Sequence, residues 1–111
     1  MAGNRALDEI VFLDNQTTIT DGETHMITSD ASVINIDFFG SGTFEAVIEG
    51  KVSHRSNNFD EIMAVNLKTY NMVSKPNTFD TWQISTVGWT YIRVKLTSVN
   101  GAVTAVGKVV G

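Results

Sequence analysis

The two histidines, His25 and His54, are the first residues to examine for chemistry in this chain of 111 residues. Imidazole is a common metal ligand and titrates near neutral pH. A zinc site needs several ligands at short spacings, such as H-x-H or H-E-x-x-H, and neither histidine belongs to such a motif. The chain has no cysteine, which excludes thiolate ligands, disulfides and a cysteine nucleophile. We therefore expect no metal and no other cofactor, and we interpret both histidines as ordinary surface or loop residues.

The carboxylates and hydroxyls offer further chemistry. Two facing acids could cleave a glycosidic bond, but Glu45 and Glu49 alternate with apolar residues and are expected on the solvent face of one strand. The G-x-S-x-G elbow of many serine hydrolases is absent, so a small hydrolase with a triad assembled from distant residues stays only a third possibility. A calcium loop is another alternative, although no EF-hand pattern is present. Its ligands would come from Asp14, Asp21, Asp30 and Asp60. We predict that the protein is not an enzyme.

Aromatic residues and one polar loop are the candidates for contact with a partner. Aromatic rings stack on sugars and pack well at protein interfaces. Trp82 alternates in phase with Ile84 and is expected in the core, whereas Tyr70 and Tyr91 are expected on outer faces. Trp89 follows a glycine at a predicted corner, where packing is the alternative interpretation. The predicted contact surface comprises Tyr70, Trp89 and Tyr91 with four residues of the loop from Ser53 to Asp60, which are His54, Arg55, Asn57 and Asn58.

The elements that must position these residues are strands. Residues 90–97 alternate polar and apolar side chains with period two and run into Asn100-Gly101, which favours a type I′ turn. A two-residue hairpin is therefore predicted, with Ile92, Val94 and Leu96 on its buried face. The predicted partners are Val99 with Ala102, Leu96 with Ala105, Val94 with Gly107, and Ile92 with Val109.

Similar alternation marks the rest of the chain. Residues 34–38 and 44–48 read as two strands, and Gly40-Ser41-Gly42 between them predicts a second hairpin. Further strands are expected at 10–13, 17–19, 24–27, 63–67 and 82–84, with Asp21-Gly22 as a turn. No segment shows the 3.6-residue period of an amphipathic helix over three turns. The predicted fold class is all-β, an antiparallel β-sandwich or jelly roll of about eight strands.

Size and charge narrow the possible functions. One domain over residues 9–111 is expected, preceded by a flexible arm of residues 1–8. The formal net charge of −4 and the absence of a basic run argue against a nucleic-acid partner. No segment resembles a signal peptide or the roughly 18 to 20 apolar residues of a membrane span. We expect a soluble protein that does not bind membranes.

The C-terminal third carries a resemblance. A tryptophan strand, a glycine-aromatic corner at Gly88-Trp89 and the strand Tyr91-Ile92-Arg93-Val94 precede a closing strand rich in valine, threonine and glycine. This pattern over residues 79–110 resembles the β-sandwich modules of tailed-phage and prophage virion proteins. Carbohydrate-binding modules of jelly-roll type share a similar ending.

The resemblance implies a structural protein of a phage or prophage particle, in capsid decoration, the neck or the tail. It would act by assembly with itself or with other virion proteins, in the virion, after synthesis in the cytoplasm of a bacterial host. The alternative is a carbohydrate-binding module that recognises a cell-surface polysaccharide. The two differ in how they use their outer faces, because a sugar module needs a patch of exposed aromatics and a virion component needs repeated protein contacts.

Overall fold

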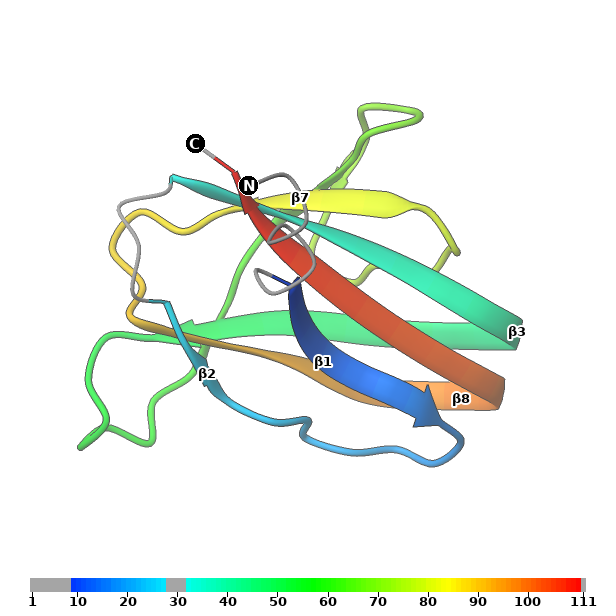
Figure 1. The fold of residues 1–111 in the computed structure, drawn as a ribbon, viewed down its shortest axis with the longest axis horizontal. Coiled ribbons are helices and arrows are strands. Elements are labelled where there is room, and N and C mark those ends of the chain that lie inside the picture. Colours follow the sequence, from blue (N-terminus) through cyan, green and yellow to red (C-terminus); the bar gives the residue numbers. More distant parts are fainter. Residues whose placement is uncertain (1–8, 28–31, 111) are drawn as a thin grey trace, which may run out of the picture.

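The computed structural model describes residues 9–27 and 32–110 of the chain (Figure 1). The predicted arm of residues 1–8 and Asp30 lie outside the described residues. In the described part there is no helix, and so none that could span a membrane. The strands are β1 (Glu9–Gln16), β2 (His25–Met26), β3 (Val33–Lys51), β4 (Asp60–Glu61), β5 (Ala64–Asn66), β6 (Met72–Val73), β7 (Thr81–Ser85) and β8 (Tyr91–Val110). The all-β fold class and the number of strands agree with the prediction.

Two long strands, β3 and β8, form the centre of the fold. They pair antiparallel along their whole length, from Val33 opposite Val110 to Lys51 opposite Tyr91. The strand order is β1-β8-β3-β7-β5-β6, with β2 added to β8 and β4 added to β3. Every pairing in this order is antiparallel.

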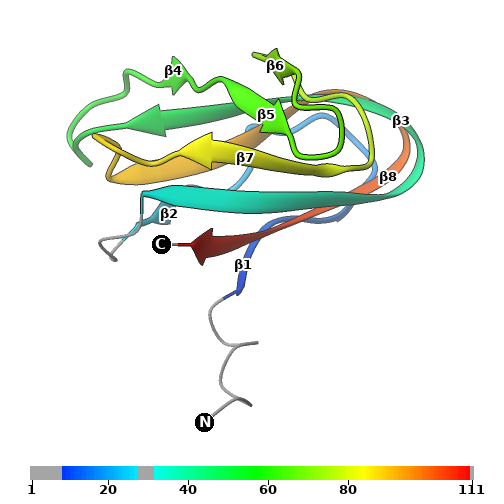
Figure 2. The same ribbon diagram turned by 90° about the horizontal axis from the view of Figure 1, so that it is seen from above.

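Both long strands fold back on themselves midway, which Figure 2 shows at the edge where β3 and β8 curve together. We call the two resulting layers layer 1 and layer 2. Layer 1 contains β1, residues 102–110 of β8, residues 33–40 of β3, and strands β7, β5 and β6. Layer 2 contains β2, residues 91–99 of β8, residues 43–51 of β3, and β4. The hydrogen-bonded sheet is thus bent into a β-sandwich.

The bend corrects both predicted hairpins. Gly42 lies opposite Gly101 and Thr43 opposite Asn100, so the two glycine-rich segments pair with each other and neither closes a two-residue turn. Gly42 and Gly101 have φ values of 83° and 121°, which glycine adopts without strain. A Cβ on Gly42 would lie 1.7 Å from the Asn100 carbonyl oxygen. The prediction that these glycines adopt positive φ angles is correct, but they lie at a bend where β3 and β8 pass together from one layer to the other.

The predicted inward face of β8 is confirmed, although its partners were wrong. Ile92, Val94 and Leu96 are at most 1% exposed. They lie opposite Gly50, Ile48 and Ala46 of β3, whereas the prediction placed Val109, Gly107 and Ala105 there. Those three residues lie instead opposite Ile34, Ile36 and Phe38 of β3. The alternation of polar and apolar residues shows which side chains point inward. It is the same whether the chain turns back in a hairpin or bends into the other layer, so it does not reveal the pairing partners.

The core fills the space between the layers. Phe38 and Phe44, one on each side of the bend, stack with their ring centroids 5.2 Å apart, and Trp82 is 3% exposed, as predicted. The other core residues include Phe12, Leu13, Ile34, Ile36, Ala46, Ile48, Ile62, Ala64, Ile84, Val103 and Ala105. Burial of this apolar surface is the main force that holds the two layers together.

Two local predictions fail for identifiable reasons. The alternation of residues 63–67 predicts that Met63, Val65 and Leu67 share the apolar face, away from Asn66 and Lys68. Instead Ile62, Ala64 and Asn66 are buried and Met63 is exposed. The reason is that hydropathy predicts a polar residue such as Asn66 on the solvent face, whereas hydrogen bonds within the chain allow its side chain to be buried. Asp21-Gly22 does not reverse the chain between two strands: Thr20 and β2 both pair with residues 91–96 of β8.

Candidate interaction surfaces

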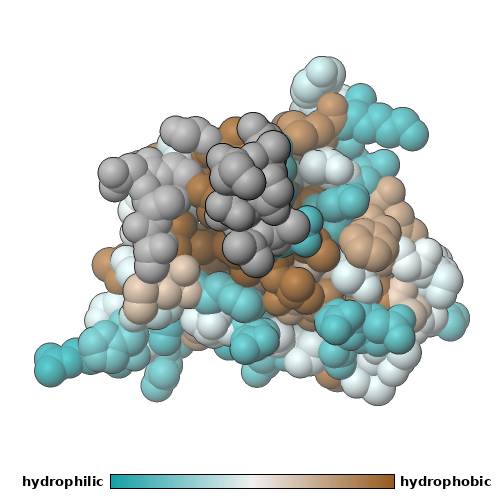
Figure 3. Space-filling model, viewed as in Figure 1, coloured by the Kyte–Doolittle hydropathy of each residue, from teal (hydrophilic) through white to brown (hydrophobic). Residues whose placement is uncertain are grey.

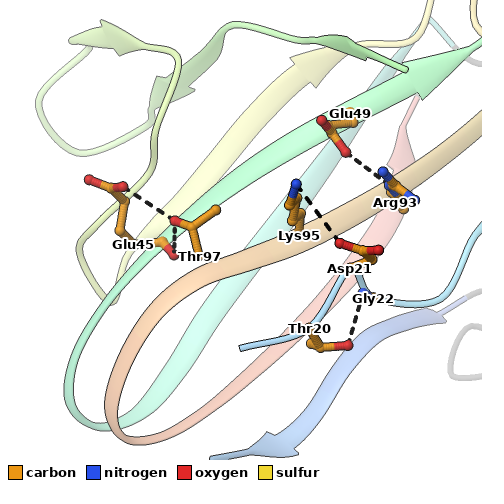
Figure 4. A network of polar contacts seen from close by, with 8 residues as sticks. All are labelled: Thr20, Asp21, Gly22, Glu45, Glu49, Arg93, Lys95 and Thr97. Atoms are coloured by element: carbon orange, nitrogen blue, oxygen red, sulfur yellow. Dashed lines mark hydrogen bonds and ion pairs between the residues drawn. The ribbon is translucent and has the colours of Figure 1, made fainter. Parts of the chain in front are cut away.

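The outer face of layer 2 is charged and internally paired (Figure 4). Arg93 Nε lies 2.9 Å from Glu49 Oε1 on the neighbouring strand, and the two side chains are only 18% and 13% exposed. Lys95 Nζ lies 3.8 Å from Asp21 Oδ1. The Thr97 hydroxyl donates to the backbone carbonyl of Glu45 at 3.0 Å and is 3.2 Å from its carboxylate. Charged groups on this face therefore already have partners within the chain.

The loop of residues 52–59 packs against the same face. The Arg93 guanidinium carbon lies 3.6 Å from the centroid of the Phe59 ring, which is a close cation–π contact. Lys51 Nζ lies between the rings of Phe59 and Tyr91, at 5.1 and 5.4 Å from their centroids, and donates to the Ser56 carbonyl at 3.1 Å. The base of the loop is thus fixed on layer 2 by Lys51 and Arg93.

The structure brings four predicted contact residues together on this loop. Its backbone is held by the Ser53 hydroxyl, which accepts from the Arg55 N–H at 3.2 Å, and by the Ser56 hydroxyl, which accepts from the Asn58 N–H at 2.9 Å. The predicted residues are all exposed to solvent and are His54, Arg55, Asn57 and Asn58. They form a polar tip that contains no phenylalanine, tyrosine or tryptophan.

Trp89 and Tyr91 lie at the end of layer 2 beside this loop. Trp89 is half-buried and packs against the core, and its ring would contact a Cβ placed on Gly50 at 2.8 Å. The indole therefore occupies space that only glycine leaves open, which fits the packing interpretation. Tyr91 is half-buried under Lys51 and lies opposite Met26 of β2.

Tyr70 lies elsewhere, at the tip of the turn between β5 and β6. It is 77% exposed and has a φ of 63°, unusual for a residue with a large side chain. Its N–H donates to the Asn66 carbonyl at 2.6 Å, while the Asn66 side-chain oxygen accepts from the Lys68 N–H at 2.8 Å. Tyr70 and Tyr91 belong to different layers, so they do not form one aromatic platform.

Asp80 anchors this turn. Its Oδ2 accepts from the Thr78 hydroxyl at 2.7 Å and from Asn66 Nδ2 at 3.0 Å. These two hydrogen bonds, the one from Thr78 foremost, lower the pKa of the Asp80 carboxyl below its ordinary value of 3.8, and the charge of Lys68 adds a smaller effect in the same direction. The carboxylate form of Asp80 is thus part of the folded structure of the turn.

The outer face of layer 1 is a surface that the sequence reasoning missed. A hollow of about 400 Å³ lies over β1, β8, β3 and β7. It is lined by apolar side chains of Phe39, Val106 and Val110 and by charged side chains of Glu9, Asp37 and Lys108, among others. Figure 3 shows brown apolar side chains together with teal polar ones on the face that is turned toward the viewer. One signal was available: Phe39 stands in phase with Asn35 and Asp37, where a wet face would carry a polar residue.

The histidines stand apart from each other. The ring of His25 contacts Phe12 edge to face at 5.2 Å, and its Nε2 is buried without a hydrogen-bond partner among the described residues. His54 is exposed on the loop of layer 2. In residues 9–27 and 32–110, no three histidine or acidic side chains gather in a way that could hold a metal ion.

Comparison with known proteins finds matches in structure but not in sequence. No protein family matches the sequence, and no curated protein does. Among solved structures, the SPBc2 prophage-derived protein YomS superposes with a TM-score of 0.83 at 19% identity, over 93% of this chain and 91% of YomS. The PBSX exported protein XepA superposes with a TM-score of 0.80 at 19% identity, over 93% of this chain. The match covers 37% of XepA, so this chain spans little more than a third of that protein.

These likenesses establish a shared fold. They extend across nearly all of the chain, beyond the C-terminal third in which the sequence resemblance was found. The same sandwich makes up most of the YomS chain and a part of the longer XepA chain. The fold is therefore one that occurs both almost alone and joined to further chain.

Proposed function

We propose that the protein is a non-enzymatic structural component of a phage or prophage particle that acts by protein–protein assembly. The observation that carries the proposal is the superposition with the prophage-derived protein YomS over nine-tenths of both chains. The match to a second protein, the PBSX exported protein XepA, supports the same proposal. Fold does not determine function by itself, so the contact surfaces must carry the rest of the argument.

Three elements are proposed to make the contacts. The outer face of layer 1 combines exposed apolar side chains with a hollow, which is the usual character of a protein-binding surface. The loop of residues 52–59 projects a polar tip from the opposite layer. Residues 1–8, which the sequence predicts to be a flexible arm, are the third element, because an arm can reach a neighbour without disturbing the sandwich.

The carbohydrate-binding alternative is not supported by a specific arrangement of side chains. Stacking on a sugar requires exposed rings on one patch. Tyr70 is exposed on the β5–β6 turn, whereas Tyr91 is half-buried beneath Lys51 in layer 2. Trp89 is packed on the core.

The proposed place of action is the virion, with capsid decoration, neck and tail as the candidate locations.

The test is co-sedimentation of the purified protein with particles from the strain that carries its gene, followed by light scattering of the protein alone. We expect the protein to self-associate or to bind the particles. Residues 1–8 are predicted from the sequence to form a flexible arm, so their removal is expected to weaken assembly and to leave the melting temperature nearly unchanged. A protein that stays monomeric, ignores the particles and binds a polysaccharide would contradict the proposal. In that event the separate variants Tyr70→Ala and Tyr91→Ala should show which of the two layers carries the sugar site.

A further inference from the structure

Charged residues of opposite sign lie on neighbouring strands of the layer 1 outer face. Lys108 of β8 lies opposite Glu9 of β1 and Asn35 of β3, and Asp37 lies two residues further along β3, opposite Val106. No ion pair within the described residues involves Glu9, Asp37 or Lys108. Layer 2 differs, because Arg93 and Lys95 both have a carboxylate partner in the chain.

These charges border apolar side chains. Phe39 is 47% exposed and Val110 is 40% exposed, and both line the same hollow as Asp37 and Lys108. A partner that covers the apolar side chains also removes water from Asp37 and Lys108, whereas Glu9 is exposed at the start of the edge strand β1 and keeps its water. The loss of water is costly unless the partner supplies a carboxylate near Lys108 and a cation near Asp37. The surface thus specifies a partner with both signs of charge, spaced like its own.

A second copy of this chain meets that specification. We infer that the outer face of layer 1 is a two-fold interface, in which Lys108 of each copy pairs with Asp37 of the other while Phe39 and Val106 pack between them. An axis in the plane of the interface, running between the two charges, exchanges their positions, so each pair forms twice. This inference rests on the proposed function and names the partner in its assembly. A polyanion is disfavoured, because two of the three charges in the hollow are negative.

The geometry can be tested with charge reversals, measured by sedimentation equilibrium. Lys108→Glu places a carboxylate against Asp37 of the other copy, and Asp37→Lys places an ammonium against Lys108. Each single variant should raise the dimer dissociation constant at least about tenfold, which corresponds to about 1.4 kcal/mol. The double variant Asp37→Lys/Lys108→Glu restores both pairs and should dimerise nearly as well as the original protein. Lys95→Glu is the matched control, because it changes the same strand on layer 2 and should leave the dissociation constant unchanged.

Mixing provides the decisive arm. In a two-fold interface, a copy carrying Lys108→Glu and a copy carrying Asp37→Lys have two favourable pairs between them, whereas each alone has two repulsive ones. An equimolar mixture should therefore form heterodimers at concentrations at which each variant alone is mostly monomeric. Thermal melting of each variant checks that both are folded, which is expected because Asp37 is exposed and Lys108 half-buried on an outer face.

The outcomes separate this inference from the proposed function. Self-association that none of the layer 1 charge reversals changes would overturn the inference and leave assembly as the function. A monomeric protein that still binds the particles would do the same. A protein that neither self-associates nor binds particles would overturn both.

Discussion

The two outer faces of the sandwich are built from the same two strands and differ in how their charges are used. On layer 2, Arg93 has Glu49, Lys95 has Asp21, and the 52–59 loop lies over the charged strands. On layer 1, Lys108 and Asp37 stand beside Phe39 and a hollow, without an ion pair among the described residues. Charges that pair within the chain need no partner molecule, so the outer face of layer 2 is stable in contact with water. Exposed apolar side chains beside charges without an intramolecular partner are typical of a protein-binding surface.

The largest effect is expected from a substitution in the core, because unfolding of the sandwich removes both outer faces. Val94 is fully buried between the layers, so Val94→Asp introduces a carboxylate with no partner into the core. We expect a loss of about 4 kcal/mol or more in the free energy of unfolding, measured by chemical denaturation. An unchanged denaturation midpoint would mean that the assigned core face is wrong.

Adjacent phenylalanines separate the core from the outer face of layer 1. Phe38 is 1% exposed and Phe39 is 47% exposed. Phe38→Ala should cost about 3–5 kcal/mol of stability, as is usual for a buried phenylalanine. Phe39→Ala should cost less than about 1 kcal/mol in the monomer, because surface substitutions are mild, and should weaken self-association instead. The comparison fails if Phe39→Ala lowers the melting temperature as much as Phe38→Ala does.

The paired charges of layer 2 should contribute to folding alone. Glu49→Gln removes the carboxylate that faces Arg93 at 2.9 Å, and we expect a loss of about 1 kcal/mol in stability without any effect on self-association. Lys108→Gln on layer 1 should show the reverse pattern. Denaturation and sedimentation of both variants measure the two quantities, and an equal effect of both substitutions on association would remove the distinction between the faces.

The smallest effect is expected at the turn at the edge of layer 1, and it should be lost in acid. Because the folded pKa of Asp80 is lowered, the stability contributed by its carboxylate is complete above the ordinary value of 3.8 and is lost as the pH falls through the folded pKa. Asp80→Asn should therefore destabilise the protein at neutral pH, and the difference from the original protein should shrink on acidification. A difference that is constant from neutral pH to strong acid would show that the charge is not involved.

The sequence predicted the fold class well because strand alternation is a local signal. Ile92, Val94 and Leu96 point inward as the period-two pattern required. The pairing partners were wrong because a glycine-rich segment that reverses the chain in one sheet looks the same as one that bends two strands between layers. Only the long-range register of Gly42 against Gly101 distinguishes these cases.

The contact residues were harder to predict than the fold. The loop carrying His54, Arg55, Asn57 and Asn58 is exposed, as its polar composition indicated. Tyr70 and Tyr91 were grouped by chemistry, but the bend places them in different layers. The face around Phe39 and Lys108 was missed because its residues come from β1, β3, β7 and β8, which meet only after the long strands have paired.

Lysine footprinting tests the central claim most directly, because it compares the two faces within one sample. The protein is acetylated briefly at low and at high concentration, and the modification of Lys108 and Lys95 is quantified by mass spectrometry. Both lysines lie on β8, in layer 1 and layer 2 respectively. We predict that Lys108 becomes protected as the concentration rises while Lys95 reacts at the same rate throughout. Protection of Lys95 with unchanged reactivity of Lys108 would contradict the assignment of layer 1 as the assembly face.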